Sequence, residues 1–138
     1  MKDFFESLNG FMKNEPTLKA LFGERIYPMI LPQNPKFPSM VYQPITTMYH
    51  RNLQEESRFV RQVVQFTIHQ TTFGKARLAR KTVKRVFQDF SGDMNGINVQ
   101  AVHTISDLTE GNGTTTQYST DEYCAILEFE FQYMEDKE

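Results

Sequence analysis

The sequence has no tryptophan, only one cysteine and three histidines, and no excess of positive charge. The single cysteine, Cys124, excludes an internal disulfide framework and a cysteine-rich zinc site, and it suggests reducing, cytosolic conditions. A net charge of −2 excludes a molecule built as a whole to coat nucleic acid. Phenylalanine is abundant instead: twelve residues, against six tyrosines, predict an aromatic core.

Long hydrophobic runs are also missing. No stretch approaches the roughly 20 apolar residues of a membrane span, and acidic residues stand near the start where a signal peptide would be apolar. We therefore expect no contact with a membrane. With 138 residues, 39% of them hydrophobic, the chain fits one domain over residues 1–138 whose core needs neither metal nor disulfide.

Three segments are predicted to be helices. Apolar residues at three- and four-residue steps predict a helix over residues 2–13, which Gly10 weakens, and Pro16 and Gly23 bound a short helix over residues 16–21. The clearest helix covers residues 75–90 and ends at Gly92. Its apolar stripe consists of Ala76, Ala79, Val83, Val86, Phe87 and Phe90.

Strand patterns fill most of the remaining chain. Residues 25–31 are extended, and three prolines make the next segment an irregular connection. Strands are predicted over residues 40–49, 59–70, 97–109 and 120–133, the last with strict alternation of apolar and polar positions. Pro44 makes the first of these an edge or bulged strand, and therefore a candidate contact between subunits. The sequence predicts an α+β fold: an antiparallel sheet of about four to five strands with helices packed on one face.

Catalytic chemistry has no support in the sequence. His50, His69 and His103 have no metal-type partner at a useful spacing, so we interpret them as ordinary strand-surface residues. Cys124 is interpreted as a packed or interfacial thiol. Residues 92–96, GDMNG, lack the features of a phosphate loop and predict a turn. We expect no enzymatic activity and no cofactor.

The helix over residues 75–90 carries much of the positive charge opposite its apolar stripe. This face is either solvated or an electrostatic docking surface, which a head-to-tail ring would require. Its counterpart on a neighbouring copy would be the acidic residues Glu128, Glu130, Glu135, Asp136 and Glu138. Nucleic acid is a third candidate partner, but the helix lacks interleaved aromatic or base-reading side chains. The six basic residues are Lys75, Arg77, Arg80, Lys81, Lys84 and Arg85.

Two polar segments, residues 50–57 and 110–119, are predicted as loops at strand ends. The second is longer than a usual hairpin connection, which suggests either a disordered tip or a segment that orders against a partner. Glu128 and Glu130 share one strand face and are interpreted as solvated acids. Besides the six basic residues of the helix, the candidate interface residues are Arg51, Arg58, Glu110, Asn112, Thr115, Tyr118, Glu128 and Glu130.

The order of several short motifs resembles the tail-completion, or tail-terminator, proteins of siphophages and prophages. The run Gly23-Glu-Arg-Ile-Tyr27 is followed by Leu31-Pro-Gln-Asn-Pro35 and Phe37-Pro-Ser-Met-Val-Tyr42. A strand, Val63-Val-Gln-Phe-Thr-Ile68, and a helix that begins Gly74-Lys-Ala-Arg-Leu-Ala79 come next. The resemblance covers about the first two thirds of the chain, and the closing strand pair in outline.

This resemblance implies a structural virion protein without cofactor. Such proteins form a hexameric ring at the head-proximal end of the tail, stop polymerisation of the major tail protein and join the tail to the head connector. The expected partners are copies of the chain, the tail tube and the connector, with a passing contact with phage DNA. The location is the virion, and the host cytoplasm during assembly. The alternatives are a small oligomeric ligand-binding or regulatory domain, or a nucleic-acid-binding accessory protein.

Overall fold

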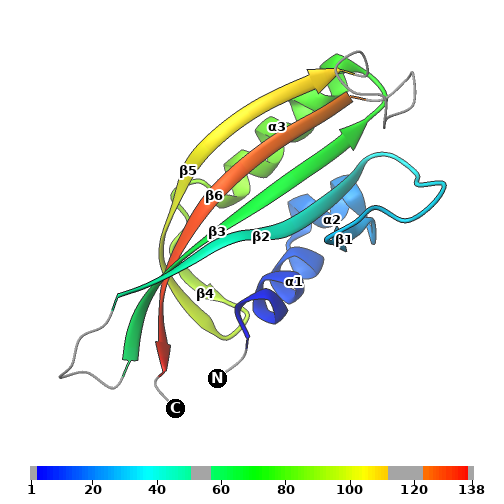
Figure 1. Cartoon of the computed structure of the whole chain (residues 1–138). Helices are drawn as coiled ribbons and strands as arrows, with labels where there is room; N and C mark the ends of the chain where they lie inside the picture. Colours follow the sequence, from blue (N-terminus) through cyan, green and yellow to red (C-terminus); the bar gives the residue numbers. More distant parts are fainter. Residues whose placement is uncertain (1–2, 51–56, 112–122, 137–138) are drawn as a thin grey trace.

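The computed structural model describes residues 3–50, 57–111 and 123–136, which form three helices and six strands (Figure 1). In chain order the elements are α1 (Phe4–Asn14), α2 (Pro16–Phe22), β1 (Ile26–Pro28), β2 (Ser39–His50), β3 (Ser57–Gln70), α3 (Phe73–Phe87), β4 (Gly92–Met94), β5 (Ile97–Gly111) and β6 (Tyr123–Asp136). The predicted helices and long strands are present, with ends shifted by a few residues. The α+β class is confirmed.

All six strands belong to one curled sheet in the order β1-β2-β3-β6-β5-β4. The four long strands are antiparallel to one another, whereas the short β1 runs parallel to β2. The prediction of four to five strands was too low because β1 and β4 have three residues each, too few for a periodic pattern. The turn predicted over residues 92–96 is confirmed only for Asn95 and Gly96, because Gly92–Met94 form β4; both loop residues have positive φ, as a two-residue hairpin requires.

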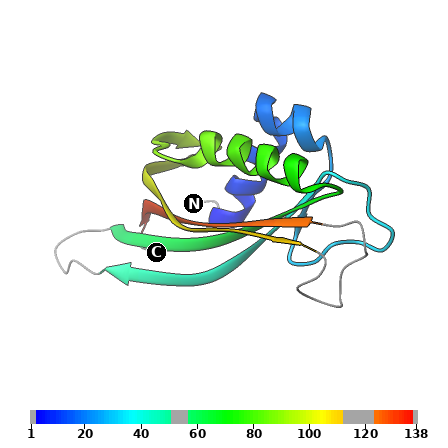
Figure 2. The same ribbon diagram turned by 90° about the horizontal axis from the view of Figure 1, so that it is seen from above.

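The helices cover one face of the sheet and leave the other open, as predicted (Figure 2). Each helix begins at a residue whose side chain accepts a backbone N–H hydrogen bond: Asp3 for α1, Glu15 for α2 and Thr72 for α3. Gly23, at φ 61°, ends α2 in a conformation that disfavours other residues. The connection after α2 then leads the chain to the sheet edge.

The core lies between the helices and the covered face of the sheet. At its centre Phe87 of α3 stacks on Phe66 of β3, with ring centroids 5.1 Å apart, and contacts Phe129 and Phe131 of β6. The alternation predicted for β6 is confirmed, because its odd-numbered residues from Ala125 to Tyr133 are buried on this face. Phenylalanine therefore supplies the centre of the core.

The end of β2 extends past the helices, together with the start of β3 (Figures 1 and 2). Its first residues are buried, but every residue from Pro44 to His50 is exposed, and the register with β3 shifts between Pro44 and Thr46. Of the two predicted alternatives, the bulged strand is confirmed by this shift, whereas an edge strand was wrong for the first half, because β1 pairs with Met40–Tyr42. For the exposed half, β3 is the one strand partner among the described residues. We call Pro44–His50 the β2 arm.

Candidate interaction surfaces

Three of the six basic residues predicted as a docking surface contact side chains of β5, although Arg77 among them stays exposed. Arg80 forms an ion pair with Asp107, and Lys84 Nζ lies 3.8 Å from the same carboxylate. Arg77 Nη1 donates a hydrogen bond of 3.1 Å to Thr109 Oγ1. These contacts anchor α3 to β5, so the charge available to a partner is smaller than the sequence indicates.

The rest of the basic face is open to solvent. Lys75, Lys81 and Arg85 are exposed, and within the described part of the chain none of them has an ion pair. Leu78 and Phe73 are exposed on the same helix. The accessible surface of α3 is therefore a mixed apolar and basic patch.

Glu130 was interpreted as solvated, and this was wrong. Its side chain is 5% exposed, and Arg61 Nη2 lies 2.8 Å from Oε1 on the open face of the sheet. Gln132 Nε2 donates a 2.8 Å hydrogen bond to Oε2. Burial by itself would raise the pKa of Glu130, but the hydrogen bonds from Gln132 and Arg61 and the charges of Arg61 and His103 outweigh it, so the pKa lies below its usual range.

Glu128 lies on the same face as Glu130 and accepts a 2.9 Å hydrogen bond from Ser106. Both acids are therefore engaged within the subunit, and Glu130 is too buried to receive a basic helix from a neighbour. The other candidate residues, Arg51, Asn112, Thr115 and Tyr118 and the side chains of Arg58 and Glu110, lie outside the described part of the structure.

The three histidines differ in their exposure to solvent. His50 and His103 are exposed on strands, as expected, but His69 is buried. Cys124 Sγ lies 3.4 Å from His69 Nδ1, and the ring of Phe37 stacks on His69 from outside the sheet. Cys124 is a packed thiol, as expected. The sequence did not reveal this pair because the two residues are 55 positions apart and meet only through the β3–β6 register.

Phe37 belongs to a segment that wraps around the sheet edge, Met29–Phe37, which we call the strap. Its beginning is held by a 2.9 Å hydrogen bond from Met29 N to Tyr42 O. Just after its end, Arg25 Nε donates to Pro38 O at 2.7 Å. Met29 has φ 68°, which turns the chain out of β1 at a conformational cost that the surrounding contacts must offset.

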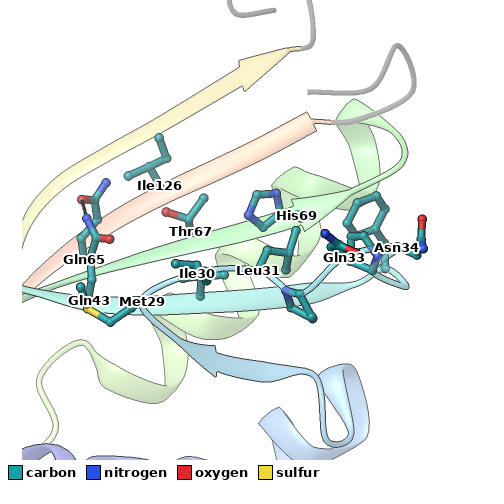
Figure 3. A pocket seen from close by; sticks show the side chains of 14 residues that line it. Met29, Ile30, Leu31, Gln33, Asn34, Gln43, Gln65, Thr67, His69 and Ile126 are labelled. Carbon is teal, nitrogen blue, oxygen red and sulfur yellow. Dashed lines mark hydrogen bonds between the residues drawn. The ribbon is translucent and has the colours of Figure 1, made fainter. Parts of the chain in front are cut away.

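The strap and the open face of the sheet enclose a groove of about 820 Å³ (Figure 3). Val41, Gln43, Gln65, Thr67 and Ile126 form its floor, and Gln43 donates a 3.2 Å hydrogen bond to Gln65. Met29 and Ile30 of the strap are strongly exposed at its wall. We call it the strap groove. It was missed because prolines and isolated apolar residues form its wall without any period.

A second groove, of about 730 Å³, lies on the helical side. Its lining comes from the junction of α1 and α2, the end of α3 and the β4–β5 hairpin. Phe11 and Phe90 pack edge to face within it, with ring centroids 5.2 Å apart, and Arg85 and Asp93 are also among its lining residues. Gly10 is explained here, because a Cβ at this position would collide with the side-chain amide of Asn95.

The described residues, 3–50, 57–111 and 123–136, show neither a metal site nor a membrane-spanning helix. They contain no group of three histidine, cysteine or acidic side chains arranged to hold a metal ion. Among the same residues no helix has the length and hydrophobicity required to cross a membrane.

Comparison with known proteins gives a structural neighbour but no sequence relative. No protein-family model matches the chain, and no curated protein sequence matches it. A solved chain from the virion of a native gene transfer agent particle superposes with a TM-score of 0.67 at 10% identity, covering 95% of this chain and 94% of that one. A second structure, at 15% identity and TM-score 0.46, is too distant to support an argument. The chain has the fold of that virion chain over nearly its whole length.

Proposed function

We propose that the chain is a structural virion protein that forms a ring at the head-proximal end of a phage tail, ends growth of the tail tube and joins the tail to the head connector. The observation that carries this proposal is the fold shared end to end with a chain of a phage-like virion. The order of motifs from Gly23 to Ala79 independently resembles tail-completion proteins.

The surfaces support an assembly role. A ring subunit needs two different patches that contact each other across a head-to-tail interface, and it needs further faces for the tube and the connector. The chain offers the β2 arm, the strap groove and the accessible patch of α3 as separate surfaces. In this proposal the chain acts by binding alone, without catalysis.

The test is to add the purified chain to the polymerising major tail protein that is encoded in the same genome. We expect tube growth to stop, with rings of six copies at one end of each tube by negative-stain electron microscopy. Tubes of unchanged length with unoccupied ends would contradict it. A Phe87→Ala variant, which lacks the centre of the core, serves as the inactive control.

A further inference from the structure

The strap groove and the β2 arm share an unusual property: neither carries an acid, lysine or arginine. Such residues make up 23% of the chain, yet none occurs among the seven residues of the arm or the fourteen residues that line the groove. Each surface has one histidine, His50 or His69. Bringing the two surfaces together would therefore bury no unpaired charge.

Apolar side chains are concentrated at the same two places. Of nine exposed large hydrophobic residues in the described structure, five lie there: Met29 and Ile30 on the groove wall, and Ile45, Met48 and Tyr49 on the arm. Ile30 is 73% exposed and Met48 36%. Exposed apolar residues gathered in this way mark contact surfaces.

The groove also has the polar groups that an extended backbone requires. Its lining contains four side-chain amides, from Gln33, Asn34, Gln43 and Gln65. Gln43 and Gln65 use one donor and one acceptor on each other, which leaves Gln43 Oε1 and Gln65 Nε2 for another partner. A strand with a free edge could satisfy both.

The β2 arm is such a strand. Beyond Tyr42 its outer edge has no strand partner in the described part of the chain, so its N–H and C=O groups form an open row. The floor of the groove, by contrast, is the beginning of β2. Gln43 in the groove floor immediately precedes the arm, which continues away from the groove along the same extended strand, so the arm cannot fold back into the groove of its own subunit.

Resting on the ring function proposed above, we infer that the strap groove receives the β2 arm of the next copy, and that this head-to-tail contact closes the ring. The groove is held open in advance by the anchors at both ends of the strap, so little ordering is needed on binding. Amides of the groove bond the edge of the arm, and Ile45 and Met48 pack against Ile30 and Ile126. A heterologous interface of this kind generates rings when the rotation closes.

Cysteine cross-linking tests this contact. The wild type is the control, because its one cysteine, Cys124, is 1% exposed. The variants are Ile30→Cys on the strap, Met48→Cys on the arm, and the two combined, each treated with a short bismaleimide. Met48 lies six residues, roughly 20 Å, along β2 from Tyr42, whose carbonyl accepts the hydrogen bond of Met29 next to Ile30, so a linker well below that length does not bridge the two sites within one chain.

We expect the double variant to give a ladder that extends beyond dimers, a mixture of the two single variants to give dimers only, and each single variant to give none. Thermal unfolding of every variant should match the wild type. Where wild-type light scattering finds only monomers in solution, the reaction is performed on rings at tube ends.

Three outcomes overturn the inference. Cross-linking of Met48→Cys to itself would show that arms pair with arms. Rings without a ladder would show that copies join elsewhere, and the proposed function would stand. Monomers that neither assemble in solution nor bind tubes would remove both the contact and the ring function.

Discussion

The two faces of the sheet are built on different principles. The covered face carries phenylalanine and aliphatic side chains that pack under the helices, including Phe66, Phe129 and Phe131. The open face combines an ion pair between half-exposed Arg61 and buried Glu130, a buried Cys124–His69 contact and an uncharged groove beneath the strap.

We expect the covered face to determine the stability of the subunit and the open face to provide the surfaces for assembly. The covered face excludes water within one subunit, and its contribution to the free energy of folding comes from burial and close packing. The open face leaves apolar residues such as Ile30 and Met48 exposed and has a groove that nothing in the described chain fills. Substitutions on the two faces should therefore have separable effects, from large losses of stability to none.

The largest effect is expected at the centre of the covered face. Phe87→Ala should lower the free energy of unfolding by about 3–5 kcal/mol, because it removes a fully buried ring that contacts Phe66, Phe129 and Phe131. Urea unfolding followed by circular dichroism measures this loss. Phe73→Ala, in the same helix but exposed, is the matched control and should change stability by less than about 0.5 kcal/mol. Equal effects would contradict the core assignment.

A smaller loss is expected at the ion pair of the open face. Arg61→Ala leaves Glu130 buried with one hydrogen-bonding partner fewer, and because Arg61 is 38% exposed we expect a loss of about 2 kcal/mol rather than the full cost of a buried charge. Since the pKa of Glu130 is lowered on folding, its contribution is complete above the ordinary carboxyl pKa of about 4.3 and is lost as pH falls through the lowered value.

The same pair therefore has a testable pH dependence. Urea unfolding of wild type and Glu130→Gln between pH 7 and pH 3 should show a steeper loss of stability with acid in the wild type. Parallel curves would contradict the lowered pKa of Glu130.

Substitutions of two adjacent residues, Arg80 and Lys81, distinguish the anchored charges on α3 from the solvent-exposed ones. Arg80→Ala should cost about 1 kcal/mol, because its ion pair with Asp107 holds α3 to β5, whereas Lys81→Ala should change stability by less than about 0.5 kcal/mol. Thermal unfolding compares them. A larger loss of stability for Lys81→Ala than for Arg80→Ala would contradict the assignment of Arg80 as anchored and Lys81 as free.

The smallest effect on stability is expected at the two surfaces of the inferred subunit contact. Ile30→Asp and Met48→Asp place a charge on exposed positions and should leave the free energy of unfolding within about 0.5 kcal/mol of the wild type. Both should abolish ring formation, because a bare carboxylate would be buried between copies. Ala20→Asp, at an exposed position of α2 outside both grooves, is the control and should assemble normally.

The covered face could be predicted from the sequence and the open face largely could not. Apolar periodicity gave the helices and the long strands, because burial on one face imposes a regular spacing. The position of Glu130 depends on Arg61, 69 residues away, and that of Cys124 on His69, so only the strand register reveals them. The strap groove depends on turns such as the one at Met29, whose positive φ has no signature in a methionine.

The mass of the chain in solution, and on tail tubes, tests the central claim most directly. Light scattering after size exclusion should find six copies of the 16.2 kDa chain in solution. If the chain alone is a monomer, six copies should bind at the ends of assembled tubes. A stable monomer or dimer that ignores tube ends would contradict the ring function.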